Sequence, residues 1–177
     1  LIQHVKLMIA ETNRLIISKL TLEDASFILE LTNTPHFIKY VGNKNLKTLE
    51  DAKNYLKEGT LKSYKNFGFG FYKLQLKQEQ NKTIGTCGLV KREQLDHVDI
   101  GFAMLPSYEG KGFGLEASKE ILKLAKNTFK LTRILAITLP TNSNSIKLLE
   151  KLGLTYEKRV KPFEDDEELL LFAKDLH

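Results

Sequence analysis

Hydrophobic positions recur along the chain with two different periods, and segments of the two kinds alternate. Short stretches in which apolar and polar residues alternate, or in which apolar residues run together, are typical of β-strands. We predict strands over residues 14–20, 67–76, 83–91, 97–105, 133–139, 154–160 and 169–173. Apolar residues spaced three or four apart are typical of amphipathic helices. We predict helices over residues 21–32, 48–56, 113–129 and 142–152.

The predicted helices carry recognisable start and stop signals. Thr21 and Thr48 each stand three residues before an aspartate, which is the spacing of a capping box. Pro35 ends the first helix, because the residue before a proline is sterically biased away from helical geometry. Gly153 ends the last one. These signals make the helix boundaries more secure than the hydrophobic pattern alone.

The element order, β-α-α-β-β-β-α-β-α-β-β, predicts an α/β protein with a mixed sheet in a single domain. The polar stretch 77–82 joins two of the strands and suggests an antiparallel hairpin. No repeat or linker divides the chain. We assign residues 11–177 to the domain and residues 1–10 to an N-terminal extension. Because the chain does not begin with Met, Met8 could be the natural start, with residues 1–7 non-native.

Composition narrows the class of protein. The chain has 177 residues, of which 42% are hydrophobic and 28% charged, as expected for a globular domain. A net charge of +5 suits anionic ligands but is too small to indicate specific nucleic-acid binding. A single cysteine excludes an internal disulfide and a cysteine-based zinc site, and we expect no metal. No apolar run reaches the roughly 20 residues of a membrane span, so we expect a cytoplasmic protein without membrane contact.

The chain is organised around residues 105–117, in which a predicted strand feeds a glycine-rich turn that opens a helix. The first turn of a helix offers unpaired backbone N–H groups and a favourable dipole for an anion, and glycines let that backbone approach a ligand. The turn therefore indicates a phosphate site. Its spacing fits neither the nucleoside-triphosphate loop nor the dinucleotide fingerprint.

The turn resembles the acetyl-CoA loop of the GCN5-related N-acetyltransferases (GNAT), Q/R-x-x-G-x-G/A, with Glu109 in the first position and glycines at 112 and 114. A second stretch, 142–154, resembles the N-x-x-S and l-l-e-k-l-G-F motifs of that superfamily, with Leu154 in place of Phe. Residues 12–15, 23–25 and 51–52 also resemble its RimJ/RimL-like branch, which includes ribosomal-protein N-terminal acetyltransferases. The resemblance implies the GNAT fold, whose central sheet is mostly antiparallel and flanked by helices.

The resemblance also implies an acetyl-CoA-dependent N-acetyltransferase without a metal. It implies that the strand before the turn splays from its neighbour and that its end pairs with the pantetheine arm through backbone groups. Asn142 would bond the pantetheine or a nearby backbone group, and it could also cap its helix. Lys147 could meet a CoA phosphate, although surface lysines usually only face solvent. The implied cofactor-binding residues are Met104, Leu105, Gly110, Lys111, Gly112, Phe113, Gly114, Asn142 and Lys147.

Attack of an amine on a thioester needs a neutral amine, a stabilised oxyanion and a proton for the departing thiolate. A backbone N–H of the splayed strand can serve the oxyanion. In the strand 97–105, His97 and Asp99 share a face with two small residues, which would suit a substrate channel or an ordinary exposed face. We take Asp99 or His97 as the candidate general base, directly or through water, with Glu93 as second choice.

Three further residues bear on the chemistry. Many GNAT relatives use a tyrosine seven residues after the motif asparagine as the acid, and this position is Leu149 here. Some RimL-like members use the motif serine, which makes Ser145 our candidate acid. A covalent route through Cys87 is conceivable, but a buried structural thiol is the simpler interpretation.

The sequence does not identify the acceptor of the acetyl group. A protein N-terminal α-amine and a small-molecule amine, such as an amino acid, polyamine or antibiotic, are both compatible with the motifs, as is a non-catalytic CoA-binding module. Residues 36–41 could wall an acceptor pocket or only pack the core, and the acidic run 164–168 could attract a basic acceptor or only face solvent. We expect a monomer or a homodimer.

Overall fold

The computed structural model describes residues 7–177, so residues 1–6 of the predicted N-terminal extension lie outside the described residues. Within that range the strands form one eight-stranded sheet in the order β1-β2-β3-β4-β5-β6-β8-β7. Every neighbouring pair is antiparallel except β5 and β6, which are parallel. The strands are β1 (Met8–Glu11), β2 (Leu15–Lys19), β3 (Phe71–Leu76), β4 (Lys82–Val90), β5 (Asp99–Met104), β6 (Arg133–Thr138), β7 (Thr155–Val160) and β8 (Leu169–Asp175).

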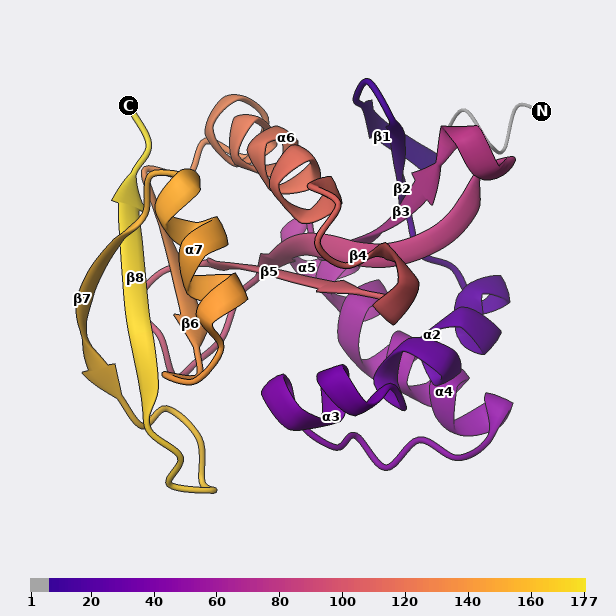
Figure 1. Cartoon of the computed structure of the whole chain (residues 1–177), viewed down its shortest axis with the longest axis horizontal. Helices are drawn as coiled ribbons and strands as arrows, with labels where there is room; N and C mark the ends of the chain where they lie inside the picture. Colours follow the sequence, from indigo (N-terminus) through magenta and orange to yellow (C-terminus); the bar gives the residue numbers. More distant parts are fainter. Residues whose placement is uncertain (1–6) are drawn as a thin grey trace.

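The helices lie on both sides of the β1–β5 half of the sheet. Figure 1 shows α6 on one side of β4 and β5, and α2, α3 and α4 on the other. Helix α7 packs against β6 in the other half. The helices are α2 (Ala25–Thr32), α3 (Pro35–Tyr40), α4 (Leu49–Leu56), α5 (Lys62–Phe67), α6 (Phe113–Asn127) and α7 (Ser143–Lys151), and a π-helical turn (Lys57–Leu61) joins α4 to α5.

The hydrophobic pattern explains how the layers pack. Tyr72, Leu74 and Leu76 alternate along β3 and are buried, whereas the residues between them are half-exposed. One face of α6 is buried as well: Ala117, Ile121 and Ala125 are fully inaccessible. Burying a side chain such as that of Ile121 contributes about 1.5–3 kcal/mol. The predicted α/β fold with a mixed, mostly antiparallel sheet is confirmed.

Three local features differ from the prediction or add to it. The strand expected from residue 67 begins only at Phe71, because residues 62–67 form α5 and Gly68, at φ +81°, ends that helix in the left-handed conformation. Pro35 does not only end a helix. It also begins α3, capped by Thr34, since proline suits the first helical position. Residues 8–10, which we assigned to the extension, belong to β1 and pair with β2.

Candidate active site

The candidate site lies where β5 and β6 separate. Strand β5 is paired with β4 over its whole length, but with β6 only at Asp99 and Leu135, where the Leu135 N–H donates to the Val98 carbonyl at 2.9 Å. Beyond this point the two strands diverge, as seen in Figure 1. A continuous cavity of about 1590 Å³ occupies the opening. The splay expected before the glycine turn is therefore present.

The alternating direction of the backbone N–H and C=O groups along β5 decides which of them face the opening. The Leu105 N–H donates to the Ile84 carbonyl of β4 at 2.8 Å, and the Leu105 carbonyl accepts from the Tyr108 N–H at 3.0 Å. Because backbone groups along a strand alternate in direction, Phe102 and Met104 direct theirs away from β4, toward the opening. Met104 is thus placed as expected. Leu105 is not, because its backbone groups are already used within the protein.

The glycine turn follows a short 3₁₀ helix (Pro106–Tyr108) and leads directly into α6. Gly112 precedes the first residue of α6 and has φ +84°, a left-handed conformation that favours glycine. Gly110, Gly112, Phe113 and Gly114 line the cavity. The Phe113 ring is buried in the core, so only its backbone can serve a ligand.

Lys111, the remaining residue of the turn, is exposed and is not among the cavity-lining residues of the described chain. Its ammonium lies 5.8 Å from the centroid of the Tyr108 ring. The side chain of Lys111 therefore points along the surface, whereas its backbone is part of the turn.

The N-terminus of α7 faces the same cavity from the β6 side. The Asn142 Oδ1 accepts a hydrogen bond from the Ser145 N–H at 3.3 Å, so Asn142 caps the helix as one of its two proposed roles requires. Asn142, Ser145 and Lys147 all line the cavity. Leu149, at the position where many relatives carry tyrosine, is buried.

Asp99 lies at the closed end of the opening and is 2% exposed. Its Oδ1 accepts a hydrogen bond from Arg92 Nε at 3.0 Å. Burial raises the pKa of Asp99 to about 6, against the lowering effect of the Arg92 charge and hydrogen bond. A cavity-lining carboxylate whose pKa lies near neutrality can take a proton at physiological pH.

The other two candidate bases are placed differently. His97 is exposed in the loop before β5, which begins two residues later than predicted, and it is not among the residues that line the cavity in the described chain. The structure therefore does not bring His97 to Asp99 in the opening. Glu93 lines the cavity but is exposed at its rim.

Cys87 lies in β4, fully buried beneath α6, with its sulfur 3.5 Å from Ser118 Oγ. Burial raises the pKa of the Cys87 thiol to about 12. Cys87 is not among the residues that line the cavity in the part of the chain described. A neutral thiol enclosed in the core is placed for packing and not for nucleophilic attack.

The outer part of the cavity has an apolar rim with charges beside it. Ile38, Val41, Tyr55 and Phe67 are exposed hydrophobic side chains on the helical layer, and all four line the cavity. Residues 36–41 form most of α3 and the residue after it, and they line the cavity, while Phe37 is also buried in the core. Across the opening, Asp165 and Glu167 of the β7–β8 loop also line it.

Two residues of this site escaped the sequence analysis. Arg92 supplies the hydrogen bond to Asp99, and a basic residue seven positions before an aspartate is no recognisable pattern. Phe102 presents backbone groups to the opening beside Met104. The register of β5 against β4 could have identified it, but register is not visible in a single strand.

The splayed sheet and the glycine turn at the head of α6 agree with the acetyltransferase fold that the resemblance implies. Residues 14–155 match the family model described as "Acetyltransferase (GNAT) domain". The chain therefore belongs to the GNAT acetyltransferase family and to its RimJ/RimL-like branch, and it is an N-acetyltransferase. The non-catalytic module that the sequence left open is set aside by this assignment.

Individual relatives agree with the assignment. The chain is 28% identical to p20 of Bacillus licheniformis, an uncharacterized N-acetyltransferase, over 86% of this chain and 85% of that protein. A GNAT-family acetyltransferase structure from Bacillus anthracis is 28% identical, covers 95% of this chain and 97% of its own, and has a TM-score of 0.75. The ribosomal L7/L12 α-N-protein acetyltransferase RimL, solved in complex with coenzyme A, shares the fold with a TM-score of 0.82 at 14% identity, covering 96% and 98%.

No helix among residues 7–177 combines the length and the apolar character that crossing a membrane requires.

Proposed function

We propose that this N-acetyltransferase moves an acetyl group from acetyl-CoA to a primary amine by direct attack in a ternary complex. The observation that carries the proposal is the opening between β5 and β6. The glycine turn and the N-terminus of α6 lie at its mouth. The free backbone groups of β5 lie along its edge, and Asp99 lies at its closed end. Acetyl-CoA, when bound, supplies the activated acetyl thioester.

The groups that the residues around the opening present are those that binding of CoA requires. The backbone N–H groups from Gly110 to Gly114 would hold the pyrophosphate at the N-terminus of α6. The backbone groups of Phe102 and Met104 would pair with the amides of the pantetheine arm, much as an added strand pairs with an open sheet edge. Asn142 and Lys147 would contact the same arm and a phosphate from the β6 side.

Asp99 would accept the proton of the acceptor amine, directly or through one water. It is ionised above about pH 6, and the Arg92 hydrogen bond holds one carboxylate oxygen so that the other can face the cavity. A backbone N–H on the free edge of β5 would donate to the carbonyl oxygen as that atom gains negative charge. As the new N–C bond forms, the C–S bond breaks.

The departing thiolate needs a proton, and Ser145 would supply it. Ser145 lies in the first turn of α7, lines the cavity and is half-exposed. Its N–H is held by the Asn142 cap, which leaves the hydroxyl as the group that can serve the reaction. The transfer needs no acetyl-enzyme, and the burial of Cys87 supports this direct route.

For the acceptor we favour the α-amine of a polypeptide over a small polar amine. The apolar rim formed by Ile38, Val41, Tyr55 and Phe67 would cover side chains that follow the reacting N-terminus, and a polyamine has none. Asp165 and Glu167 would attract the positive charge of the approaching amine. RimL, which shares this fold, is by its name an α-N-protein acetyltransferase of ribosomal L7/L12.

An acceptor screen with thiol detection tests the proposal. The panel contains peptides with free N-termini and apolar or polar leading residues, the same peptides with blocked N-termini, amino acids, polyamines and aminoglycosides. We expect thiol release above background with free-N-terminal peptides only, and faster release with apolar leading residues. Turnover of a small amine without peptide turnover would overturn the acceptor assignment. No turnover of any amine, together with no binding of acetyl-CoA in a titration, would overturn the function.

A further inference from the structure

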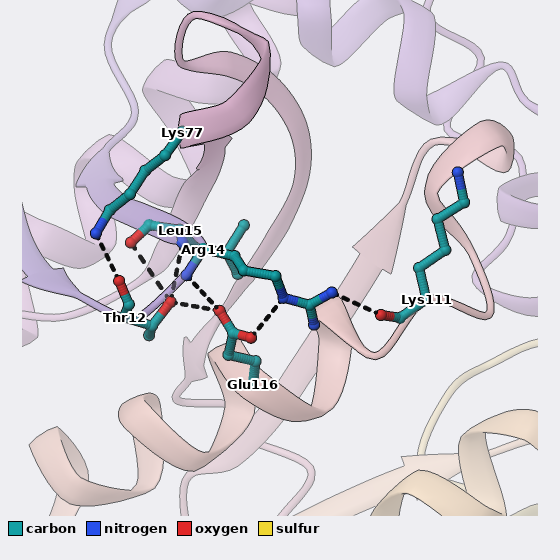
Figure 2. Close-up of polar contacts among 6 residues, drawn as sticks. All are labelled: Thr12, Arg14, Leu15, Lys77, Lys111 and Glu116. Atoms are coloured by element: carbon teal, nitrogen blue, oxygen red, sulfur yellow. Dashed lines mark hydrogen bonds and ion pairs between the residues drawn. The ribbon is translucent and has the colours of Figure 1, made fainter.

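The turn between β1 and β2 lies against the glycine turn, although the two are about a hundred positions apart in the chain. This turn contains Thr12 and Arg14, which the proposed reaction does not use. Figure 2 shows both side chains reaching Glu116 in the first turn of α6, with Arg14 placed between Glu116 and the backbone of Lys111. The arrangement ties the edge of the sheet to the cofactor loop.

Glu116 is the centre of this cluster. Its carboxylate accepts hydrogen bonds from Thr12 Oγ1 at 2.6 Å, from the Arg14 N–H at 3.1 Å and from Arg14 Nε at 2.8 Å. Partial burial alone would raise the pKa of Glu116, but the hydrogen bonds from Thr12 and Arg14 lower it, so the side chain is ionised. The Thr12 hydroxyl also accepts from the Leu15 N–H at 3.0 Å, which fixes the turn itself.

Arg14 makes a second contact that bears on phosphate binding. Its Nη1 donates to the Lys111 carbonyl at 3.0 Å, and its guanidinium stacks 4.2 Å from the centroid of the Phe113 ring. In a trans peptide the C=O and the following N–H point in opposite directions. Holding the Lys111 carbonyl toward Arg14 therefore turns the Gly112 N–H away from Arg14. Gly112 lines the cavity and Arg14 does not, so we take that direction to be toward the cavity.

The charge of Arg14 matters as well as its shape. A carboxylate in the first turn of a helix interacts favourably with the helix dipole, but it would repel a phosphate bound at the same helix end. The Arg14 guanidinium bonds Glu116 directly and cancels most of that repulsion. One residue thus orients the Lys111–Gly112 peptide of the turn and neutralises a carboxylate in the first turn of α6.

We propose that Arg14, anchored by Glu116, is a positioning residue that sets the phosphate-binding conformation of the glycine turn. This proposal rests on the proposed function, because it assumes that the turn holds the pyrophosphate of acetyl-CoA. Arg14 acts through the Lys111–Gly112 peptide and through Glu116 without touching the cofactor. Its removal therefore affects steps that use the phosphates and spares steps that do not.

The test compares Arg14→Met with wild type, using two acetyl donors. Titration with acetyl-CoA should show a loss of affinity of about tenfold or more, the usual effect of removing a hydrogen bond to a charged group. The KM for acetyl-CoA should rise similarly while kcat changes little. With acetyl-pantetheine, which lacks the pyrophosphate and nucleotide, kcat/KM should be unchanged.

Arg133→Met is the matched control. Arg133 also forms ion pairs, with Asp175 and Glu157, but it lies at the far end of β6 and does not line the cavity. Its loss should leave the affinity for acetyl-CoA unchanged. An equal loss of affinity in both variants would mean that general destabilisation, and not the turn, is responsible, and would overturn the proposal.

Two further variants separate positioning from plain structural support. In Arg14→Met/Glu116→Gln the unpaired carboxylate is gone, so acetyl-CoA affinity should recover in part, whereas a purely structural pair would give no recovery. Arg14→Lys keeps the charge, but one ammonium cannot reproduce the planar fork that bonds Glu116 and Lys111 together, so affinity should fall to an intermediate level. Arg14→Lys also serves if Arg14→Met does not fold.

The outcomes are distinguishable from failure of the proposed function. Wild type that does not bind acetyl-CoA would contradict the function itself. Wild type that binds, with Arg14→Met binding equally well or losing as much activity with acetyl-pantetheine as with acetyl-CoA, would overturn only the role given to Arg14.

Discussion

At the scale of single residues, the properties of Asp99 come from its position and not from its neighbours in the sequence. Asp99 lies in β5 at the point where β4 and β6 both pair with it, its carboxylate is buried, and desolvation disfavours the charged form. Arg92 offsets this desolvation only in part, which leaves the pKa of Asp99 at about 6. An exposed aspartate would be too weak a base to take a proton from an ammonium group efficiently.

Asp99→Asn should lower kcat/KM by about 10²-fold or more if Asp99 is the base. In wild type the base must be ionised, so kcat/KM should rise with pH through about 6, and this rise should be absent in the variant. The measurement is the pH profile of kcat/KM on the best acceptor. His97→Gln should keep the wild-type profile, because His97 lies outside the cavity lining. A rise through pH 6 that persists in Asp99→Asn would remove Asp99 from this role.

The same shift affects stability, with a sign opposite to that of a carboxylate whose pKa is lowered on folding. The folded protein holds the Asp99 proton up to about pH 6, whereas the unfolded chain releases it near pH 4. The folded state therefore binds more protons in this window, and the contribution of Asp99 to stability falls as pH rises from about 4 to 6. Melting temperatures of wild type relative to Asp99→Asn should fall over the same window.

Ser145→Ala should lower kcat by about 10- to 10³-fold while acetyl-CoA affinity changes little, because the hydroxyl acts on the departing thiolate. Steady-state kinetics beside a binding titration make the comparison. Serines in a first helical turn often serve only the helix backbone. If kcat holds and only affinity or melting temperature falls, the serine is structural and water delivers the proton.

At the scale of elements, the glycine turn is held between the short 3₁₀ helix that precedes it and α6, which follows it. The turn can present its N–H groups because Gly112 is left-handed and because Tyr108 and Phe113, both buried, fix it on either side. A β-branched residue at φ +84° is strained, and its side chain would press on Arg14, since even a Cβ there would lie 3.3 Å from Nη2.

Gly112→Val should therefore abolish measurable acetyl-CoA binding while the fold survives. Calorimetric titration measures the affinity, and circular dichroism checks the fold. Gly68→Val is the matched control, since Gly68 has a similar φ of +81° at the end of α5 but does not line the cavity. Gly68→Val should lower the melting temperature, as Gly112→Val does, but it should leave the affinity for acetyl-CoA unchanged. Unchanged affinity in folded Gly112→Val would remove the turn from the site.

At the scale of the whole molecule, the site joins two halves of one sheet. Strands β1–β5 and strands β6–β8 are connected in the sheet by a single registered pair, Asp99 and Leu135. Helix α6 with the glycine turn belongs to the first half, and α7 with Asn142 and Ser145 to the second. A ligand in the opening touches both halves and should hold them together.

Acetyl-CoA should accordingly raise the melting temperature of the protein. At a ligand concentration of 100 times Kd the stabilisation is about 2.7 kcal/mol. For a domain of this size that corresponds to about 5–10 °C. Differential scanning fluorimetry across a concentration series measures it, with acetate as the control that lacks every CoA group. A melting temperature that does not move with acetyl-CoA would contradict binding in the opening.

Much of this protein followed from the sequence alone, and what followed was local. The capping threonines, the buried stripe of α6, the glycine turn and the N-x-x-S stretch each depend on residues within a few positions of one another. Hydrogen bonds and packing at that range are set by the chain itself. This is why the family and most of the element order could be derived without coordinates, whereas β1, α3 and α5 were missed.

Only the tertiary structure decided which candidates share a site. The burial of Asp99 depends on β4 and β6, its partner Arg92 comes from the loop before β5, and the free edge of β5 depends on where β6 departs. The backbone of Leu105 was excluded by its register with Ile84, and His97 by the late start of β5. The bond between Arg14 and Glu116 joins residues 102 positions apart. Such contacts arise when the sheet is assembled, because burial and backbone pairing are properties of the packed molecule, and no short stretch of sequence encodes them.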